Sequence, residues 1–278
     1  MRYLIKRNIR KRGDSMRDPH VESLRYKLKT HATTIYKNPS AVKVIRAEFE
    51  CLLNDGVLTC HMRKHYPAVG EARRVVEDFL HSWEIKTELE MGRGEMRFKF
   101  EDSQVIDRDP PPPGSPKIVR VSGTVNITSN VSAILHVKRR KYPDPPTVFT
   151  VTPDVETLWQ RYNNFLDGKE PLPSMANFCL TLVESKADGK VKKGKRKFAA
   201  NLFLIDEPIL NMLGNLTANR GDPMTARKVP ENGRSMTALS EKEKKWIEAV
   251  VKILIQRTGE LANIQSAQRI TMKDLPKI

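Results

Sequence analysis

The residue types that could do chemistry are few in this chain, and their spacing argues against most reactions. Cys60, His61 and His65 come closest to a metal-binding motif. In a strand Cys60 and His61 would point to opposite faces, whereas a structural zinc ion needs four converging ligands. No G-x-S-x-G nucleophile motif and no G-x-x-x-x-G-K-[ST] phosphate loop occurs. We therefore expect no metal and no cofactor, and we favour a protein that is not an enzyme.

Positive charge is concentrated in two short stretches. Residues 2–12 carry six basic side chains and no acid, and residues 186–197 carry seven basic side chains with Asp188 as the one acid. The two stretches therefore hold most of the formal net charge of +16. Local clusters of this kind favour polyanions such as nucleic acid or an anionic membrane, although a solvated tail and loop would have the same composition.

The second stretch is our predicted nucleic-acid interface, in which lysine and arginine contact phosphates of RNA or DNA. The residues that we assign to it are Lys190, Lys192, Lys193, Lys195, Arg196 and Lys197, together with Arg220. We interpret the first stretch as a basic N-terminal arm or, alternatively, as residues ahead of a true start at Met16.

The segment after the second stretch has the pattern of a helix-turn-helix unit. Ala199 and Ala200 are small, and Pro208 can open a second helix. The apolar positions that such a unit requires are occupied by Phe203, Ile205, Leu210 and Leu213. The preceding lysines would then lie where contacts to DNA phosphates are expected.

Two features leave the alternative of two ordinary bundle helices open. Leu204 occupies the position where a glycine would make the tight turn. The second helix also offers few base readers, of which Asn211 and Asn215 are the obvious ones and Arg220 stands at the end.

The hydrophobic pattern changes near residue 150, which predicts two domains. Before it, apolar and polar residues mostly alternate, as in strands with one wet face. We predict strands over residues 23–30, 84–91 and 95–101, hairpins over 47–62 and 117–138, and one helix over 71–83. The predicted class is therefore α+β, a mostly antiparallel sheet with one packed helix, followed by an all-helical bundle.

Helix signals dominate the second half of the chain. Thr152 and Pro153 open one helix, while Ser240 and Glu243 form a capping box at the start of the last and longest one. The predicted parts are a basic arm over 1–19, an α+β domain over 20–150, a helical bundle over 151–262 with the basic insertion at 186–197, and a tail over 263–278. We expect the tail to be loose as far as Leu275.

The three cysteines bear on the compartment. The turn signal Asp55-Gly56 would place Cys51 opposite Cys60 in a hairpin, and Cys179 stands alone. A redox pair is one interpretation. We favour two reduced, partly buried thiols and a cytoplasmic protein, because the count is low and odd. No apolar run approaches the roughly 20 residues that span a bilayer, so we expect no transmembrane segment.

The helical half resembles the HEPN class of helical domains. The resemblance covers residues 152–260 and depends on the order of helices and on the segment 216–222 around Arg220. Members that cleave RNA pair such an Arg with a His four to six residues later. The six histidines of this chain all lie at or before His136. The resemblance therefore implies a role for Arg220 in an RNA-directed defence or toxin-type enzyme, without the histidine that the cleavage chemistry requires.

Three functional hypotheses follow. The first is a non-enzymatic binding protein associated with nucleic acid. The second is the HEPN-like enzyme, and the third is a structural or interaction protein that binds a protein partner and uses its charge for solubility. The sequence does not fix the oligomeric state.

Overall fold

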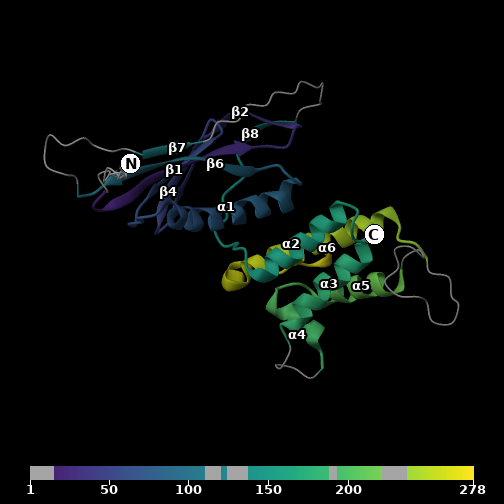
Figure 1. The fold of residues 1–278 in the computed structure, drawn as a ribbon. Coiled ribbons are helices and arrows are strands. Elements are labelled where there is room, and N and C mark those ends of the chain that lie inside the picture. Colours follow the sequence, from purple (N-terminus) through teal and green to yellow (C-terminus); the bar gives the residue numbers. More distant parts are fainter. Residues whose placement is uncertain (1–15, 110–119, 124–136, 188–192, 221–236) are drawn as a thin grey trace, which may run out of the picture. The chain divides into compact units, whose positions relative to one another are not determined.

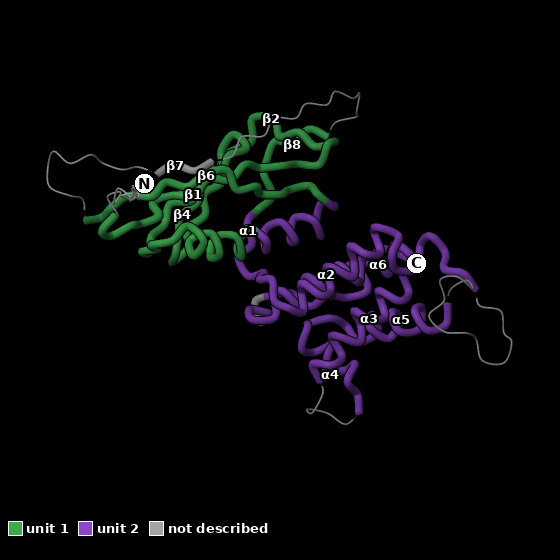
Figure 2. The backbone as a smooth tube through the Cα atoms, in the orientation of Figure 1, with its two compact units in different colours: residues 1–80, 94–144 green, residues 81–93, 145–278 purple. Residues whose placement is uncertain are grey.

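A computed structural model describes residues 16–109, 120–123, 137–187, 193–220 and 237–278, so the predicted arm lies almost entirely outside the described residues. The chain forms two compact units (Figure 2). Unit 1 comprises residues 1–80 and 94–144, and unit 2 comprises residues 81–93 and 145–278. Among the described residues no helix is both long and apolar enough to cross a membrane.

Unit 1 is built on a six-stranded antiparallel sheet with the strand order β3-β4-β5-β1-β6-β7 (Figure 1). The strands are β1 (Pro19–Lys29), β3 (Val42–Ile45), β4 (Phe49–Asn54), β5 (Val57–Met62), β6 (Arg97–Asp107) and β7 (Arg120–Gly123). A separate parallel pair joins β2 (Thr34–Ser40) to β8 (Val137–Lys141). The sequence pattern predicted neither β2 nor β3.

One face of the sheet is covered by the first half of α1 (Val69–Met91). The guanidinium of Arg73 lies 4.1 Å from the ring centre of Phe100, and the rings of Phe79 and Phe49 are 5.6 Å apart. Tyr26 packs edge-on against Phe100 on this covered face. Successive side chains of a strand point to opposite faces of the sheet. The residues that alternate with Tyr26, Phe49 and Phe100 along their strands therefore project from the other side of the sheet, which we call the open face.

The predicted hairpin over 47–62 is present as β4 and β5. Asp55 and Gly56 both have positive φ, 47° and 74°, as a two-residue type I′ turn requires. Cys51 is directly opposite Cys60, as predicted from this turn. The expectation of two reduced, partly buried thiols is wrong, because the two side chains are completely buried and joined by a disulfide.

The predicted strand over 84–91 is wrong, because these residues continue α1 to Met91. Ile85 and Leu89 are both buried and stand four residues apart, which is the spacing of one helix face. The same two residues, with Met91, also fall at every second or fourth position, so the pattern fits an alternating strand as well. No glycine or proline interrupts the segment before Gly92, whose φ of 116° ends the helix. The boundary between the units falls within this helix, after Leu80.

The predicted hairpin over 117–138 lies largely outside the described residues. Its described ends do not pair with each other, since β7 pairs with β6 and β8 pairs with β2. Partner choice between strands depends on tertiary packing rather than on the apolar pattern alone.

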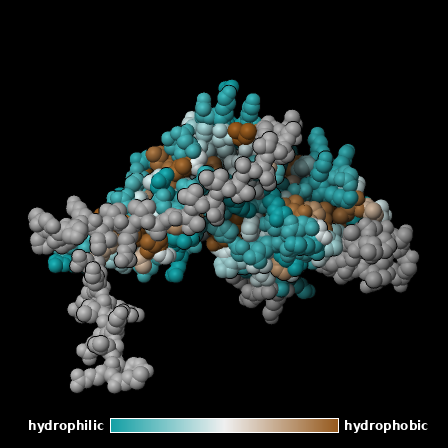
Figure 3. All heavy atoms as spheres, turned by 45° about the horizontal axis from the view of Figure 1, so that its top comes forward, coloured by the Kyte–Doolittle hydropathy of each residue, from teal (hydrophilic) through white to brown (hydrophobic). Residues whose placement is uncertain are grey.

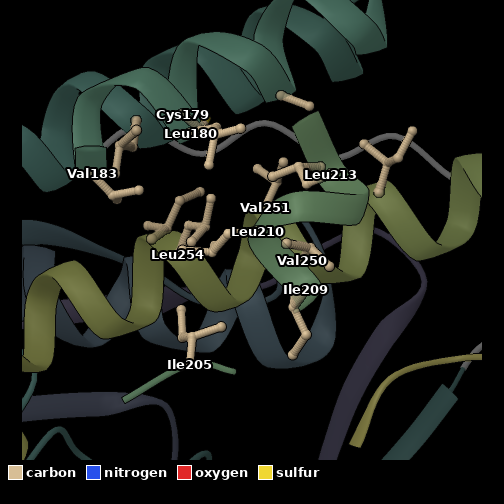
Figure 4. Close-up of a cluster of buried hydrophobic side chains, with 14 of the residues drawn as sticks. Cys179, Leu180, Val183, Ile205, Ile209, Leu210, Leu213, Val250, Val251 and Leu254 are labelled. Carbon is tan, nitrogen blue, oxygen red and sulfur yellow. The ribbon is translucent and has the colours of Figure 1, made fainter. Parts of the chain in front are cut away.

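Unit 2 is all-helical, as predicted, and the α+β class is confirmed. Its described helices include α2 (Pro153–Leu166), α3 (Leu172–Ser185), α4 (Lys195–Leu202), α5 (Glu207–Asn219) and α6 (Glu241–Glu260). The side chain of Thr152 accepts a hydrogen bond from the N–H of Val155 (3.3 Å), and Ser240 and Glu243 form the predicted capping box. Figure 4 shows how α3, α5 and α6 meet in one apolar core.

The C-terminal tail is packed rather than loose. It contains two short 3₁₀ helices, Leu261–Ser266 and Met272–Asp274. Ile270 forms a β-bridge with Ile205, and Leu275 is buried in the core of unit 2. Its apolar residues are too widely spaced to form a periodic pattern, so no sequence pattern predicted this packing.

Candidate nucleic-acid interface

The segment that was predicted as a helix-turn-helix unit folds as α4, a four-residue turn over 203–206, and α5. Leu204 has a φ of 49°, in the left-handed region that glycine normally provides at this position. The N–H of Ile205 donates to the carbonyl of Ala200 (2.9 Å), which closes the turn. The turn therefore has a left-handed residue where the motif has glycine, and here that residue is leucine.

The apolar positions of this unit are all buried. Ala199, Ala200, Phe203, Ile205, Leu210 and Leu213 are each at most 2% exposed. Figure 4 shows Ile205, Leu210 and Leu213 among the side chains gathered around α6. These contacts hold α4 and α5 in one arrangement through a shared core.

The C-terminal tail braces the turn. The N–H of Ile270 donates to the carbonyl of Leu204 (2.8 Å), and the N–H of Asp206 donates to the carbonyl of Ile270 (2.9 Å). The guanidinium of Arg269 donates to the carbonyl of Ile205 (3.2 Å). Backbone groups that a tight turn leaves without partners are thereby hydrogen-bonded, and this offsets part of the cost of the left-handed leucine.

Three asparagines form the exposed stripe of α5. Asn211, Asn215 and Asn219 stand four residues apart, so they lie along one side of the helix, and all three are exposed. The sequence pattern singled out the first two and missed Asn219, although the same four-residue spacing extends to it. The amide of Asn211 also accepts a hydrogen bond from Arg196 (3.2 Å).

The predicted basic residues separate into three groups. Lys190 and Lys192 lie outside the described residues, whereas Lys193, Lys195 and Lys197 are exposed at the start of α4. The remaining two, Arg196 and Arg220, are held in ion pairs within unit 2.

The two arginines have structural partners. Arg196 donates from Nε to Glu184 (2.6 Å) and lies on Gly214, where a Cβ atom would come within 2.9 Å of the guanidinium. Arg220 lies 3.6 Å from Glu243. The pKa of Glu243 is lowered mainly by the hydrogen bond from the backbone N–H of Ser240, with a smaller contribution from Arg220. Both arginines therefore hold unit 2 together.

The start of α4 combines several positive features. Its N-cap is Gly194, with no side-chain cap, and its first turn has no acidic residue. Cations at a helix N-terminus oppose the helix dipole, whereas anions are favoured there. The positive end of the helix dipole and the exposed lysines would both attract a phosphate.

Within the described parts of the chain, no group of three or more His, Cys, Asp or Glu side chains is placed to hold a metal ion. The sulfur of Cys60 is bonded to Cys51, so it is not available beside His61.

Comparisons with protein-family models, with curated proteins and with solved structures gave no match to this chain.

Proposed function

We propose that this is a non-enzymatic DNA-binding protein that uses α4 and α5 as a helix-turn-helix unit. The observation that carries the proposal is the positive φ of Leu204 at the turn, together with the burial of every apolar position that the motif requires. In such units the second helix lies in the major groove and the first crosses the DNA backbone. In this proposal α5 would lie in the major groove and α4 would cross the DNA backbone.

Each exposed group has a part in this proposal. Lys193, Lys195 and Lys197 would contact phosphates and supply affinity without sequence preference. The asparagine stripe of α5 would reach base edges, where an asparagine amide pairs with N6 and N7 of adenine. We therefore expect a preference for sites that contain adenine.

The phosphate contacts are tested by measuring affinity for a labelled mixed-sequence DNA duplex at about 50 mM and about 200 mM salt. We expect the variant Lys193→Ser/Lys197→Ser to bind more weakly, with a salt slope reduced by up to about two, roughly one for each lost phosphate contact. The matched control Lys64→Ser/Lys244→Ser removes two lysines that already pair with Glu48 and Glu241. An equal loss in this control would show that net charge alone is responsible.

The base contacts are tested by selecting bound duplexes from a library of random sequence. The protein should enrich a short motif that contains adenine, and Asn211→Ala/Asn215→Ala should lose the enrichment but keep the salt-dependent affinity. Binding to RNA in preference to duplex DNA, or no enrichment by the unaltered protein, would contradict the proposal.

No observation favours the RNA-cleaving alternative over this one. Arg220 is the residue that it would use, and the ion pair with Glu243 already engages that guanidinium.

A further inference from the structure

A ladder of cations crosses the open face of the sheet in unit 1. In the pairing of β1 with β6, Lys27 is directly opposite Lys99, and Lys29 is directly opposite Arg97. These four residues, which we call the cation ladder, project from the side opposite α1, because Tyr26 and Phe100 between them contact each other on the covered face. The next row, Arg25 and Asp102, is an ordinary opposite-charge pair at 3.4 Å.

The lysines of the ladder are exposed and have no ionic partner among the described residues. Lys27, Lys29 and Lys99 are all exposed, and no described carboxylate lies within 4.0 Å of their ammonium groups. Of the nearby acids, Asp102 pairs with Arg25, and Glu95 is buried with Arg139. Glu101 follows Lys99 by two residues on β6, beyond ion-pair distance of the ladder lysines. The described surface in Figure 3 is mainly hydrophilic, and hydrophobic side chains are scattered between the polar ones.

This arrangement works against folding. Like charges directly opposite in an antiparallel pair destabilise the sheet, and the row of Lys27 and Lys99 is of that kind. An anion bound across both rows would reverse the sign of the interaction. A chain of phosphates suits a ladder whose rows repeat every second residue along the strands, because it presents a regular series of negative charges.

More positive charge gathers at the same end of the sheet. The N–H of Gly56 donates to the hydroxyl of Tyr142 (2.9 Å), and the N–H of Leu28 donates to the carbonyl of Gly56 (2.8 Å). Tyr142 directly follows β8, in which Lys138, Arg140 and Lys141 are exposed. The basic residues of β8 therefore belong to the same end of unit 1 as the ladder.

We propose that the cation ladder is a second nucleic-acid surface, which binds the phosphate backbone without reading bases. In the strand pairs of the described sheet, no Phe, Tyr or Trp stands at a position that faces the open side. Aromatic rings that could stack on single-stranded bases are therefore missing from this part of the face. The exposed apolar residues of this face, Ile45 and Leu52, lie on β3 and β4, and β5 separates them from the ladder. Cations and apolar groups are thus not interleaved, which favours a phosphate chain over a membrane surface.

This surface goes beyond the helix-turn-helix proposal, since it lies in the other unit and would bind without α5. The test measures the affinity of the full-length variant Lys27→Gln/Lys99→Gln and of the unaltered protein for the labelled mixed-sequence duplex, across the same salt range. We expect weaker binding and a salt slope reduced by about two. The control Lys64→Gln/Lys244→Gln removes the same charge from lysines paired with Glu48 and Glu241, and should keep the original slope.

A second readout separates lost binding from lost folding. Removing the like-charge row should leave the melting temperature unchanged or raise it while affinity falls. The charge-retaining variant Lys27→Arg/Lys99→Arg should bind as the unaltered protein does. An unchanged slope for the glutamine variant, or failure of the arginine variant to restore binding, would overturn the proposal.

The outcomes also separate the two proposals. If the glutamine variant binds normally while the variant Lys193→Ser/Lys197→Ser does not, the ladder proposal is wrong and the helix-turn-helix proposal stands. The reverse result removes the helix-turn-helix proposal and supports the ladder. Binding to phosphatidylserine vesicles but not to DNA would assign the ladder to a membrane surface and overturn its assignment here.

Discussion

At the scale of single residues, Leu204 decides how the candidate interface is interpreted. From sequence, a leucine at the turn position argued against the motif, because a side chain in the left-handed region costs about 1–2 kcal/mol. The structure places it there with a φ of 49°. The buried neighbours and the hydrogen bonds from the tail outweigh that cost.

Substitutions at Leu204 test this strain. Leu204→Gly should leave stability nearly unchanged or raise it, because relief of the positive φ offsets the added freedom of the unfolded chain. Leu204→Ile should destabilise by about 1 kcal/mol or more, because a β-branched side chain is especially unfavourable at positive φ. Urea unfolding of the two variants gives both values, and equal destabilisation would argue against a left-handed turn.

The cysteines give a second prediction at this scale. Burial raises the pKa of the Cys179 thiol to about 12, with a smaller contribution from the charge of Glu170. Cys51 and Cys60 are joined in a disulfide. The native protein should therefore show no thiol that reacts rapidly with a neutral-pH reagent, and unfolding without reductant should expose one. Three reactive thiols after unfolding without reductant would restore the interpretation of reduced cysteines.

At the scale of elements, local capping signals were the most reliable part of the sequence. Ser240 and Glu243 form the capping box of α6 as predicted, because the contacts are made within four residues. The helix α1 shows the opposite case, since apolar residues over 84–91 fit both a strand and a helix. Packing within unit 2 decided between them, as the burial of Ile85 and Leu89 in its core shows.

Removing the cap of α6 should cost about 1 kcal/mol. The variant Ser240→Ala leaves the N–H of Glu243 without its side-chain acceptor, whereas Ser240→Asp should keep most of the stability. Thermal unfolding of both variants measures the difference. Equal values for alanine and aspartate would show that the cap contributes nothing.

Two helical glycines make a matched pair. A Cβ atom at Gly259 in α6 would overlap the ring of Phe149, so Gly259→Ala should destabilise by about 1–3 kcal/mol. At Gly70 in α1 nothing lies within 4 Å of the added atom, so Gly70→Ala should stabilise by about 0.5 kcal/mol. Hydrogen exchange should locate the first effect in unit 2 and the second in unit 1, which tests the division into two units.

At the scale of the whole molecule, acid stability depends in part on His20. Burial lowers the pKa of this imidazole below its ordinary value of 6.5, and Arg108 adds to the effect. The folded chain therefore binds fewer protons than the unfolded chain as pH falls below about 6.5, so the stability present above that pH is progressively lost. His20→Gln should flatten this part of the profile in urea unfolding between about pH 5 and about pH 7. A steeper dependence in the variant would contradict this assignment.

The sequence alone determined the α+β class, the helix caps, the β4–β5 turn and the apolar positions around Leu204, since each depends on residues close together in the chain. Only the tertiary structure decided which cations have partners. Arg196 and Arg220 look like their neighbours in sequence, yet distant carboxylates bind them. The cation ladder was equally hidden, because its rows join residues about seventy positions apart, and only strand register brings Lys27 opposite Lys99.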